Sequence, residues 1–173
     1  LLWCRDQGVA GNIAAVSIAA QQHGSVYLNR TALEQIQTLD PNAPPHGQLV
    51  NIFSRKGCPI WMDSSTNQEC REITQMFGHK ELIDLTGSAA TERFAGPQIR
   101  KFWKHDPKSY EKTSHIALIS SFFTSLLMGN WAPLDCGDSL GMNLVDLKSR
   151  DWSTAAMNAA APDLASRLPQ IID

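Results

Sequence analysis

Two short polar turns carry the residues of this sequence that could contact a ligand. The first is Gln-Gln-His-Gly at 21–24, which interrupts two strand-like runs, where a plain hairpin would use Asn-Gly or Asp-Gly. A neutral imidazole offers one hydrogen-bond donor and one acceptor, which suits a hydroxyl group that does both. His23 therefore has two interpretations: it binds a ligand at a strand end, or it bonds backbone groups of its own turn.

The second turn is Thr-Glu-Arg-Phe-Ala-Gly at 91–96, and its cation is Arg93. A guanidinium beside small residues can approach a ligand closely and donate several hydrogen bonds at fixed angles. The alternative is a surface pair with Glu92, which contributes little energy. Asp63 follows an apolar run and precedes a helix. Its carboxylate could accept a hydroxyl or hold an arginine, or it could complement the positive end of the helix.

Several signatures of other chemistry are absent from the sequence. It contains no Gly-rich P-loop, no G-x-G-x-x-G and no H-E-x-x-H. The four remaining histidines have no ligand spacing, so we expect no metal site. Asp135 and Asp138 stand three apart beside glycine, but Mg²⁺ needs more ligands than this stretch supplies, which favours a turn.

Composition is that of one ordinary domain of 173 residues, with 43% hydrophobic residues and a formal net charge of -2. This balance gives no reason to expect a nucleic acid or membrane partner. The four cysteines form no C-x-x-C pair, which indicates reduced thiols and a cytoplasmic location. The longest apolar run, at 116–129, is shorter than the roughly 20 residues of a membrane span. Because the chain opens without Met and closes on no evident element, we expect it to be part of a longer protein.

Short strand-like and helix-like patterns alternate, which predicts an α/β domain. The expected elements are a helix end at 1–8, a buried strand at 12–20, its neighbour at 25–29, a loop at 38–47, a strand-to-helix transition at 58–79, a helix starting at Pro97, an apolar run at 115–120 with an apolar helical face behind it, a loop at 134–143 and a helix at 153–161. A capping box of Ser65 with Gln68, or of Thr66 with Glu69, is expected before 67–77, and Gly78 is expected to end that helix.

Five blocks stand in a fixed order between about Gly11 and about Pro162: QQHGSVY, CPIWMDSST, LTGSAATERFAGPQI, ISSFFTSLLMG and DSLGMNLVDLKSRDWS. Together they resemble the FGGY family of carbohydrate kinases, most closely its eukaryotic xylulose kinase branch. The resemblance implies a two-domain enzyme of the actin-like, ribonuclease-H-like ATPase superfamily. It further implies that residues 1–173 are an incomplete N-terminal, sugar-binding domain, without the first strands and the second domain.

The resemblance also implies roles for individual residues. His23 and Arg93 correspond to residues that bind D-xylulose, while Gln22 shapes the same turn and Asp63 supports the site. Gln98 stands where bacterial members have a lysine. No catalytic residue and no metal ligand is expected in this chain. The general-base aspartate, the ATP site and most Mg²⁺ contacts would belong to the missing parts.

The implied reaction is transfer of the γ-phosphoryl group of ATP to the 5-hydroxyl of D-xylulose, a step of xylose metabolism that yields D-xylulose 5-phosphate. We expect no kinase activity from this chain alone, and we expect exposed apolar surface to promote its self-association. Two alternatives stay open. One is a non-catalytic carbohydrate-binding relic, and the other is a sister kinase that acts on glycerol, gluconate or ribulose.

Overall fold

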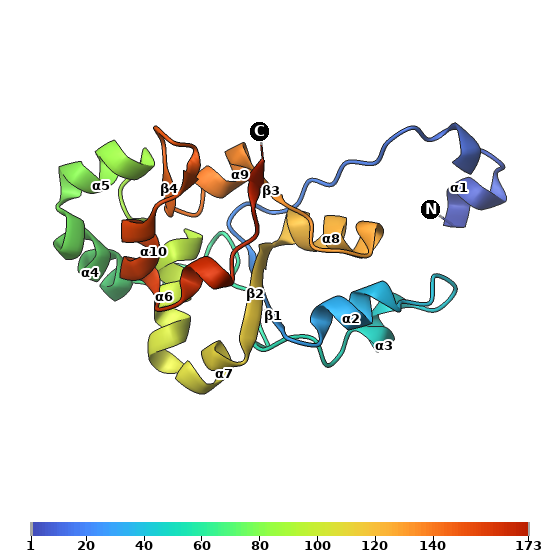
Figure 1. Cartoon of the computed structure of the whole chain (residues 1–173), viewed down its shortest axis with the longest axis horizontal. Helices are drawn as coiled ribbons and strands as arrows, with labels where there is room; N and C mark the ends of the chain where they lie inside the picture. The colour runs from blue at the N-terminus through green and yellow to red at the C-terminus, as the bar shows by residue number, and fades with distance from the viewer. Residues whose placement is uncertain (1, 173) are drawn as a thin grey trace.

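The computed structural model describes residues 2–172, and Figure 1 labels its elements. The α-helices are α1 (Leu2–Asp6), α2 (Ala32–Gln37), α3 (Pro45–Gln48), α4 (Asn67–Phe77), α5 (His79–Thr86), α6 (Ala95–His105), α7 (Pro107–Glu111), α8 (Ile119–Met128), α9 (Cys136–Leu140) and α10 (Thr154–Ala160). The 3-10 helices are η1 (Ala10–Asn12) and η2 (Leu164–Ser166). The strands are β1 (Ser25–Asn29), β2 (Thr113–Leu118), β3 (Leu134–Asp135), β4 (Val145–Asp146), β5 (Asp151–Trp152) and β6 (Ile171–Ile172). None of the described helices has both the length and the apolar character that crossing a membrane requires.

The centre of the fold is an antiparallel pair of strands, β1 and β2, which cross the middle of Figure 1. Ser25 lies opposite Leu118 and Asn29 lies opposite Thr113, with an irregularity after Leu28. The strand predicted at 25–29 is confirmed, and the apolar run at 115–120 supplies its partner. The smaller pairs are β3 with β6, which is parallel, and β4 with β5, which is antiparallel.

The strand pair separates two hydrophobic cores, because successive side chains of a strand point to opposite faces. Tyr27 and Ile116 face a core shared with α6, α7 and α10. Val26, Leu28 and Ala117 face a second core shared with α2 and α8. Each face of the pair is therefore covered by helices, and the strands are held from both sides.

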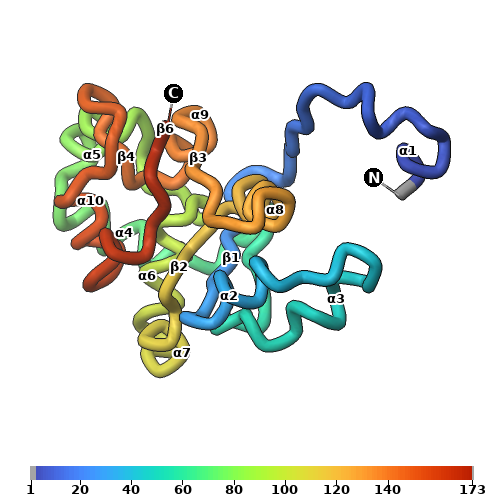
Figure 2. The backbone as a smooth tube through the Cα atoms, turned by 45° about the vertical axis from the view of Figure 1, so that its right-hand side comes forward, coloured from blue at the N-terminus to red at the C-terminus, as the bar shows by residue number. Residues whose placement is uncertain are grey.

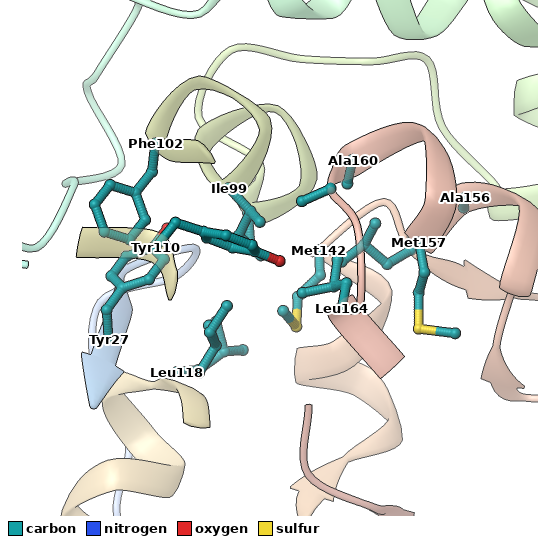
Figure 3. Close-up of a cluster of buried hydrophobic side chains, with 14 of the residues drawn as sticks. Tyr27, Ile99, Phe102, Tyr110, Leu118, Met142, Ala156, Met157, Ala160 and Leu164 are labelled. Carbon is teal, nitrogen blue, oxygen red and sulfur yellow. The ribbon is translucent and has the colours of Figure 1, made fainter. Parts of the chain in front are cut away.

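The first core is built around aromatic side chains, as Figure 3 shows. Phe102 of α6 meets the Tyr27 ring edge-on, with the ring centroids 4.7 Å apart, and its centroid lies 6.0 Å from that of Tyr110 of α7. Ile99 and Met157 extend this core towards α10. The packing fixes α6 against β1, and α6 follows directly on the turn that carries Arg93.

An ion-pair network joins α4 to α6. Arg100 is 8% exposed and donates from Nε to Glu72 at 2.7 Å and from Nη1 to the Ala159 carbonyl. Lys104 donates to the same Glu72 at 2.6 Å. The Lys104 hydrogen bond, together with that from Arg100, lowers the pKa of Glu72 to about 2. The network holds the two helices together.

The predicted strand at 12–20 is wrong. Apart from η1 at its start, this segment has no regular secondary structure, and all of its residues except Ile18 are exposed. Figures 1 and 2 show it running away from the strand pair towards α1. An apolar run becomes a strand only where a neighbour takes its N–H and C=O groups, and among residues 2–172 no strand pairs with this segment.

Local differences also occur around the two ends of α4. The helix starts after Thr66, but no side chain caps it, because the Thr66 hydroxyl donates to the Glu92 carbonyl at 2.6 Å instead. The predicted capping box is therefore wrong, whereas the predicted end at Gly78 is confirmed, with φ of 86°. The strand expected at 58–62 is absent from the described structure.

Other expected elements are shifted rather than lost. The helix expected to start at Pro97 begins two residues earlier, at Ala95. Pro97 is therefore its third residue, which is allowed because a proline is tolerated in the first turn of a helix. The loop predicted at 134–143 contains β3 and α9, and Asp135 caps α9 by accepting from Gly137 N–H at 2.8 Å and Asp138 N–H at 3.3 Å. The apolar face expected on α8 is only half covered, because Phe123 is 48% exposed.

Candidate functional site

Two adjoining cavities bring together three segments that are far apart in the sequence. The first has a volume of about 480 Å³ and the second of about 340 Å³. The first is lined by Gln21, Gln22, His23, Trp61 and Arg93; the second is lined by Trp61, Met62, Asp63, Ser64, Thr91, Glu92 and Arg93. All four residues singled out from the sequence thus line one continuous region, with Trp61 and Arg93 shared between its halves.

His23 enters the first cavity from a strained turn directly before β1. Its backbone is left-handed, with φ of 64°, which is uncommon for a residue other than glycine. Its ring packs at 4.9 Å from the Phe94 ring, and Nδ1 lies 3.0 Å from the Gly141 carbonyl oxygen. A carbonyl only accepts, so Nδ1 carries the hydrogen and Nε2 of the neutral ring is the acceptor. His23 thus bonds a backbone carbonyl of a distant segment rather than of its own turn, and its other nitrogen keeps the capacity to accept a hydrogen bond.

The surroundings of His23 favour its neutral form. Burial and the Arg93 charge lower the pKa, while the Gly141 hydrogen bond and the Asp138 charge raise it, and the net shift is downward from 6.5. The ring is thus neutral at pH 7, with Nε2 able to accept a hydrogen bond. The close approach depends on a glycine, because a Cβ at Gly141 would lie 2.9 Å from the ring Cε1.

Arg93 projects from a turn that is held by buried side chains. The Phe94 N–H donates to the Thr91 carbonyl at 3.0 Å, and the Glu92 carbonyl accepts from Thr66 at 2.6 Å and from Gln98 at 3.0 Å. The guanidinium is exposed and lies 5.8 Å from the Phe94 ring centroid.

The surface pair between Arg93 and Glu92, weighed as an alternative, does not form. The Glu92 carboxylate accepts instead from Asn67 at 3.0 Å. Within residues 2–172 no carboxylate forms an ion pair with Arg93. Its donors are therefore available to a ligand in either cavity.

Asp63 supplies a carboxylate to the second cavity. Its Oδ1 accepts from the Ser65 N–H at 2.8 Å and from the Ser65 hydroxyl. Burial opposes ionisation, but the hydrogen bonds from Ser65 and Gln98 and the Lys101 charge outweigh it, so the pKa of Asp63 is below 3.8. Asp63 is not the residue before α4, since Thr66 holds that position. The group is thus an ionised acceptor at neutral pH.

Sequence reasoning missed Trp61, which is 53% exposed and borders both cavities. Its position two residues before Asp63 was the available signal, because an exposed aromatic beside polar groups is typical of a binding surface. Gln22 lines the first cavity. No group of three or more His, Cys, Asp or Glu side chains in the described part of the chain could hold a metal ion.

The combined chemistry of the cavities is that of a site for a small polyhydroxylated molecule. Arg93 provides only donors, Asp63 provides only acceptors, and His23 Nε2 provides one further acceptor. Trp61 adds an apolar face. Hydroxyl groups both donate and accept, so a ligand that carries several of them has partners for each of these groups.

Residues 56–173 match the family model described as the N-terminal domain of the FGGY family of carbohydrate kinases. The chain belongs to this family. It is 46% identical over 160 residues to Xylulose kinase 2 of Arabidopsis thaliana and 42% identical over 157 residues to the xylulose kinase of Mus musculus. These alignments cover 92% and 90% of the chain but only 29% and 28% of the two relatives, so the chain spans less than a third of their length.

Solved structures agree on the fold. The xylulose kinase of Rhodospirillum rubrum has a TM-score of 0.71 at 14% identity, covering 90% of this chain and 28% of that one. The gluconate kinase of Lactobacillus acidophilus has a TM-score of 0.75 at 14% identity, covering 100% of this chain and 31% of that one. The α/β, actin-like ATPase fold expected from the sequence is thereby confirmed.

Proposed function

We propose that the chain is the sugar-binding part of a kinase that phosphorylates D-xylulose with ATP, and that residues 1–173 form part of its N-terminal domain. The observation that carries the proposal is that His23 and Arg93 line one cavity, while Nδ1 of His23 is bonded to the Gly141 carbonyl. The choice of sugar rests on the relatives at 42–46% identity, which are xylulose kinases.

Each residue has a task that follows from its hydrogen-bonding capacity. His23 accepts a hydrogen bond from a xylulose hydroxyl at Nε2, because Nδ1 is committed to Gly141. Arg93 donates to the hydroxyl and carbonyl oxygens of the sugar, and Asp63 accepts from a hydroxyl in the second cavity. Gln22 shapes the turn that carries His23. Holding the ketose at several points orients its terminal hydroxyl and lowers the entropic part of the barrier to transfer.

We assign no catalytic residue to this chain. The aspartate that takes the proton of the attacking hydroxyl, and the groups that bind ATP, belong by this proposal to the length of the relatives that the chain does not match. The described residues include no group of carboxylates suited to Mg²⁺, so we derive no step through a metal. Xylulose-dependent release of ADP by the 173-residue chain alone would contradict this assignment.

The fold does not choose among sugars, since a gluconate kinase is as similar in structure as the xylulose kinases are. A site that bonds hydroxyl groups disfavours a ligand that leaves its groups unpaired, by about 0.5–1.5 kcal/mol per lost bond where water still reaches the group, as it does at the exposed Arg93. We therefore expect D-xylulose to bind more tightly than D-ribulose, gluconate or glycerol. A calorimetric titration with the four compounds measures this order, and tighter binding of another compound would assign a sister activity.

The proposal is tested by titrating the chain with D-xylulose and following tryptophan fluorescence, because Trp61 borders both cavities. The Arg93→Ala variant is compared with Arg30→Ala, which removes an exposed arginine beyond the opposite end of β1. We expect saturable binding, weakened at least about 10-fold by Arg93→Ala and unchanged by Arg30→Ala. Equal binding by Arg93→Ala would refute the role of Arg93.

A folded chain that binds no xylulose would contradict a sugar site within these residues. The kinase and the non-catalytic carbohydrate-binding relic are distinguished by the activity of the complete protein. Xylulose-dependent ADP release by the complete protein supports the kinase, and binding without ADP release supports a non-catalytic carbohydrate-binding protein.

A further inference from the structure

Asn143 is a buried asparagine that stands two residues after Gly141, whose carbonyl oxygen bonds His23. The residue is 3% exposed and lines neither cavity of the sugar site. Its backbone is left-handed, with φ of 61°, a conformation that asparagine adopts more often than most residues other than glycine. A buried amide on such a backbone calls for an explanation of what its side chain holds.

The amide nitrogen of Asn143 is bonded to the segment that ends α5. Nδ2 donates to Thr86 Oγ1 at 2.7 Å, to the Ser88 carbonyl at 3.1 Å and to Ser88 Oγ at 3.2 Å. Oδ1 is buried and accepts no hydrogen bond from the described residues. Turning the amide around would set Oδ1 against the Ser88 carbonyl, which also only accepts. The fold thus leaves an acceptor unpaired and keeps the nitrogen directed at 86–88.

The segment that receives these hydrogen bonds is itself fixed. Thr86 is 3% exposed, and its hydroxyl donates to the Leu82 carbonyl at 3.0 Å, one turn earlier in α5. Leu82 is fully buried. Because the Thr86 hydrogen is directed at a carbonyl, Oγ1 is the acceptor in the bond from Asn143. The contact therefore ties two sequence blocks together through a rigid helix end, LTGSAATERFAGPQI and DSLGMNLVDLKSRDWS.

The turn from Ser139 to Asn143 carries this anchor to His23. The Met142 N–H donates to the Ser139 carbonyl at 3.0 Å. That N–H and the Gly141 carbonyl belong to one planar peptide group, so neither can turn without the other. The plane lies between a residue that is bonded back into α9 and the anchored Asn143. The direction of the Gly141 carbonyl, 3.0 Å from Nδ1 of His23, follows from where Asn143 is held.

We propose that Asn143 is a positioning residue that holds the Gly141 carbonyl against Nδ1 of His23, and so keeps Nε2 without a hydrogen and ready to accept from a sugar hydroxyl. The inference rests on the proposed function for its ligand. Asparagine meets both requirements of the position, because it tolerates a left-handed backbone and its amide donates two hydrogens. Glycine meets only the first of them.

Asn143→Gly separates the two requirements, since glycine keeps the left-handed backbone and removes the anchor. Nitrogen NMR of the His23 ring measures the fraction with the hydrogen on Nδ1, and calorimetry measures D-xylulose affinity. We expect this fraction to decrease and affinity to fall about 5-fold, the effect of one ordinary hydrogen bond. The Gly96 N–H still bonds the Met142 carbonyl at 2.8 Å, so the turn stays attached to α6. Asn42→Gly, on the exposed loop between α2 and α3, is the control and should change neither quantity.

Thr86→Val is a second variant, which removes an acceptor of Asn143 without altering the turn, should Asn143→Gly fail to fold. We expect the same changes in smaller measure, because Ser88 still bonds the amide. Thr38→Val is its matched control. The Thr38 hydroxyl also donates to a carbonyl four residues earlier, at 2.9 Å, but it lies on the exposed end of α2.

The two readouts separate this inference from the proposed function. An Nδ1–H fraction that stays as in the unmodified chain overturns the inference, and so does a decreased fraction with unchanged D-xylulose affinity. If the unmodified chain binds no D-xylulose, the proposed function fails instead. The NMR signal of the His23 ring, which needs no sugar, then decides by itself whether Asn143 orients that ring.

Discussion

Replacing Gly141 by alanine isolates the contact that orients His23. A Cβ at this position would lie 2.9 Å from Cε1 and 3.0 Å from Nδ1 of the ring, whereas ordinary contacts begin at 3.4 Å. The backbone does not oppose the change, because Gly141 has φ of -67°. The ring must therefore retreat by about 0.5 Å, which stretches the Nδ1 hydrogen bond from 3.0 Å to roughly 3.5 Å.

The magnitudes predict a loss of binding without a loss of stability. Losing one hydrogen bond costs about 1 kcal/mol, and alanine restores about 0.4–1 kcal/mol by restricting the unfolded chain. The free energy of unfolding should thus change little. Sugar affinity depends on Nε2 being placed correctly and unprotonated, so we expect Gly141→Ala to weaken D-xylulose binding by about 1–2 kcal/mol, or about 5- to 30-fold.

Three measurements check this prediction. Calorimetry gives the affinity, urea unfolding gives the stability, and nitrogen NMR of the His23 ring reports which nitrogen carries the hydrogen. Gly47→Ala is the control, since a Cβ there meets nothing within 4 Å. An unchanged ring signal with unchanged affinity would refute the reasoning. Equal losses in both variants would show a general effect of removing glycine.

The remaining predictions concern protonation and charge. Because His23 has a lowered pKa, D-xylulose affinity should stay constant from pH 8 to below 6.5 and fall only once Nε2 is protonated; a fall already above pH 7 in calorimetry would contradict this. Burial lowers the pKa of His115 to about 4, so the neutral ring contributes fully to stability above pH 6.5. As the pH falls towards 4, the free energy of unfolding should decrease by about 3 kcal/mol. Urea unfolding at pH 7 and pH 4.5 measures the loss, which His115→Phe should remove. Glu72→Gln should lower the free energy of unfolding at pH 7 by about 2 kcal/mol, because buried Arg100 loses its ion pair, while exposed Glu34→Gln should have no effect. The Glu72 contribution is present above pH 4.5 and lost as pH falls to about 2, so a stability difference that persists at pH 2 would be evidence against it.

The local sequence pattern was sufficient to predict the elements whose ends are marked by turn residues or by glycine. The strand at 25–29 is apolar and lies between turn residues, and α4 has a 3.6-residue apolar period that ends at Gly78. The segment 12–20 has an equally strand-like composition, yet it stays unpaired and exposed. Composition describes a residue's preference, whereas a strand also requires a partner, which the sequence of the strand itself does not encode.

The sequence alone determined which residues stand in the two polar turns, His23 and Arg93 among them, and the order of blocks that indicated the kinase family. Only the tertiary structure decided what those side chains can do. The free nitrogen of His23 follows from a carbonyl 118 residues away, at Gly141. The donors that hold the Glu92 carbonyl, next to Arg93, come from Thr66 and Gln98 on other elements. Hydrogen-bond direction depends on the partner as well as on the side chain, and folding alone brings such distant partners within 3 Å.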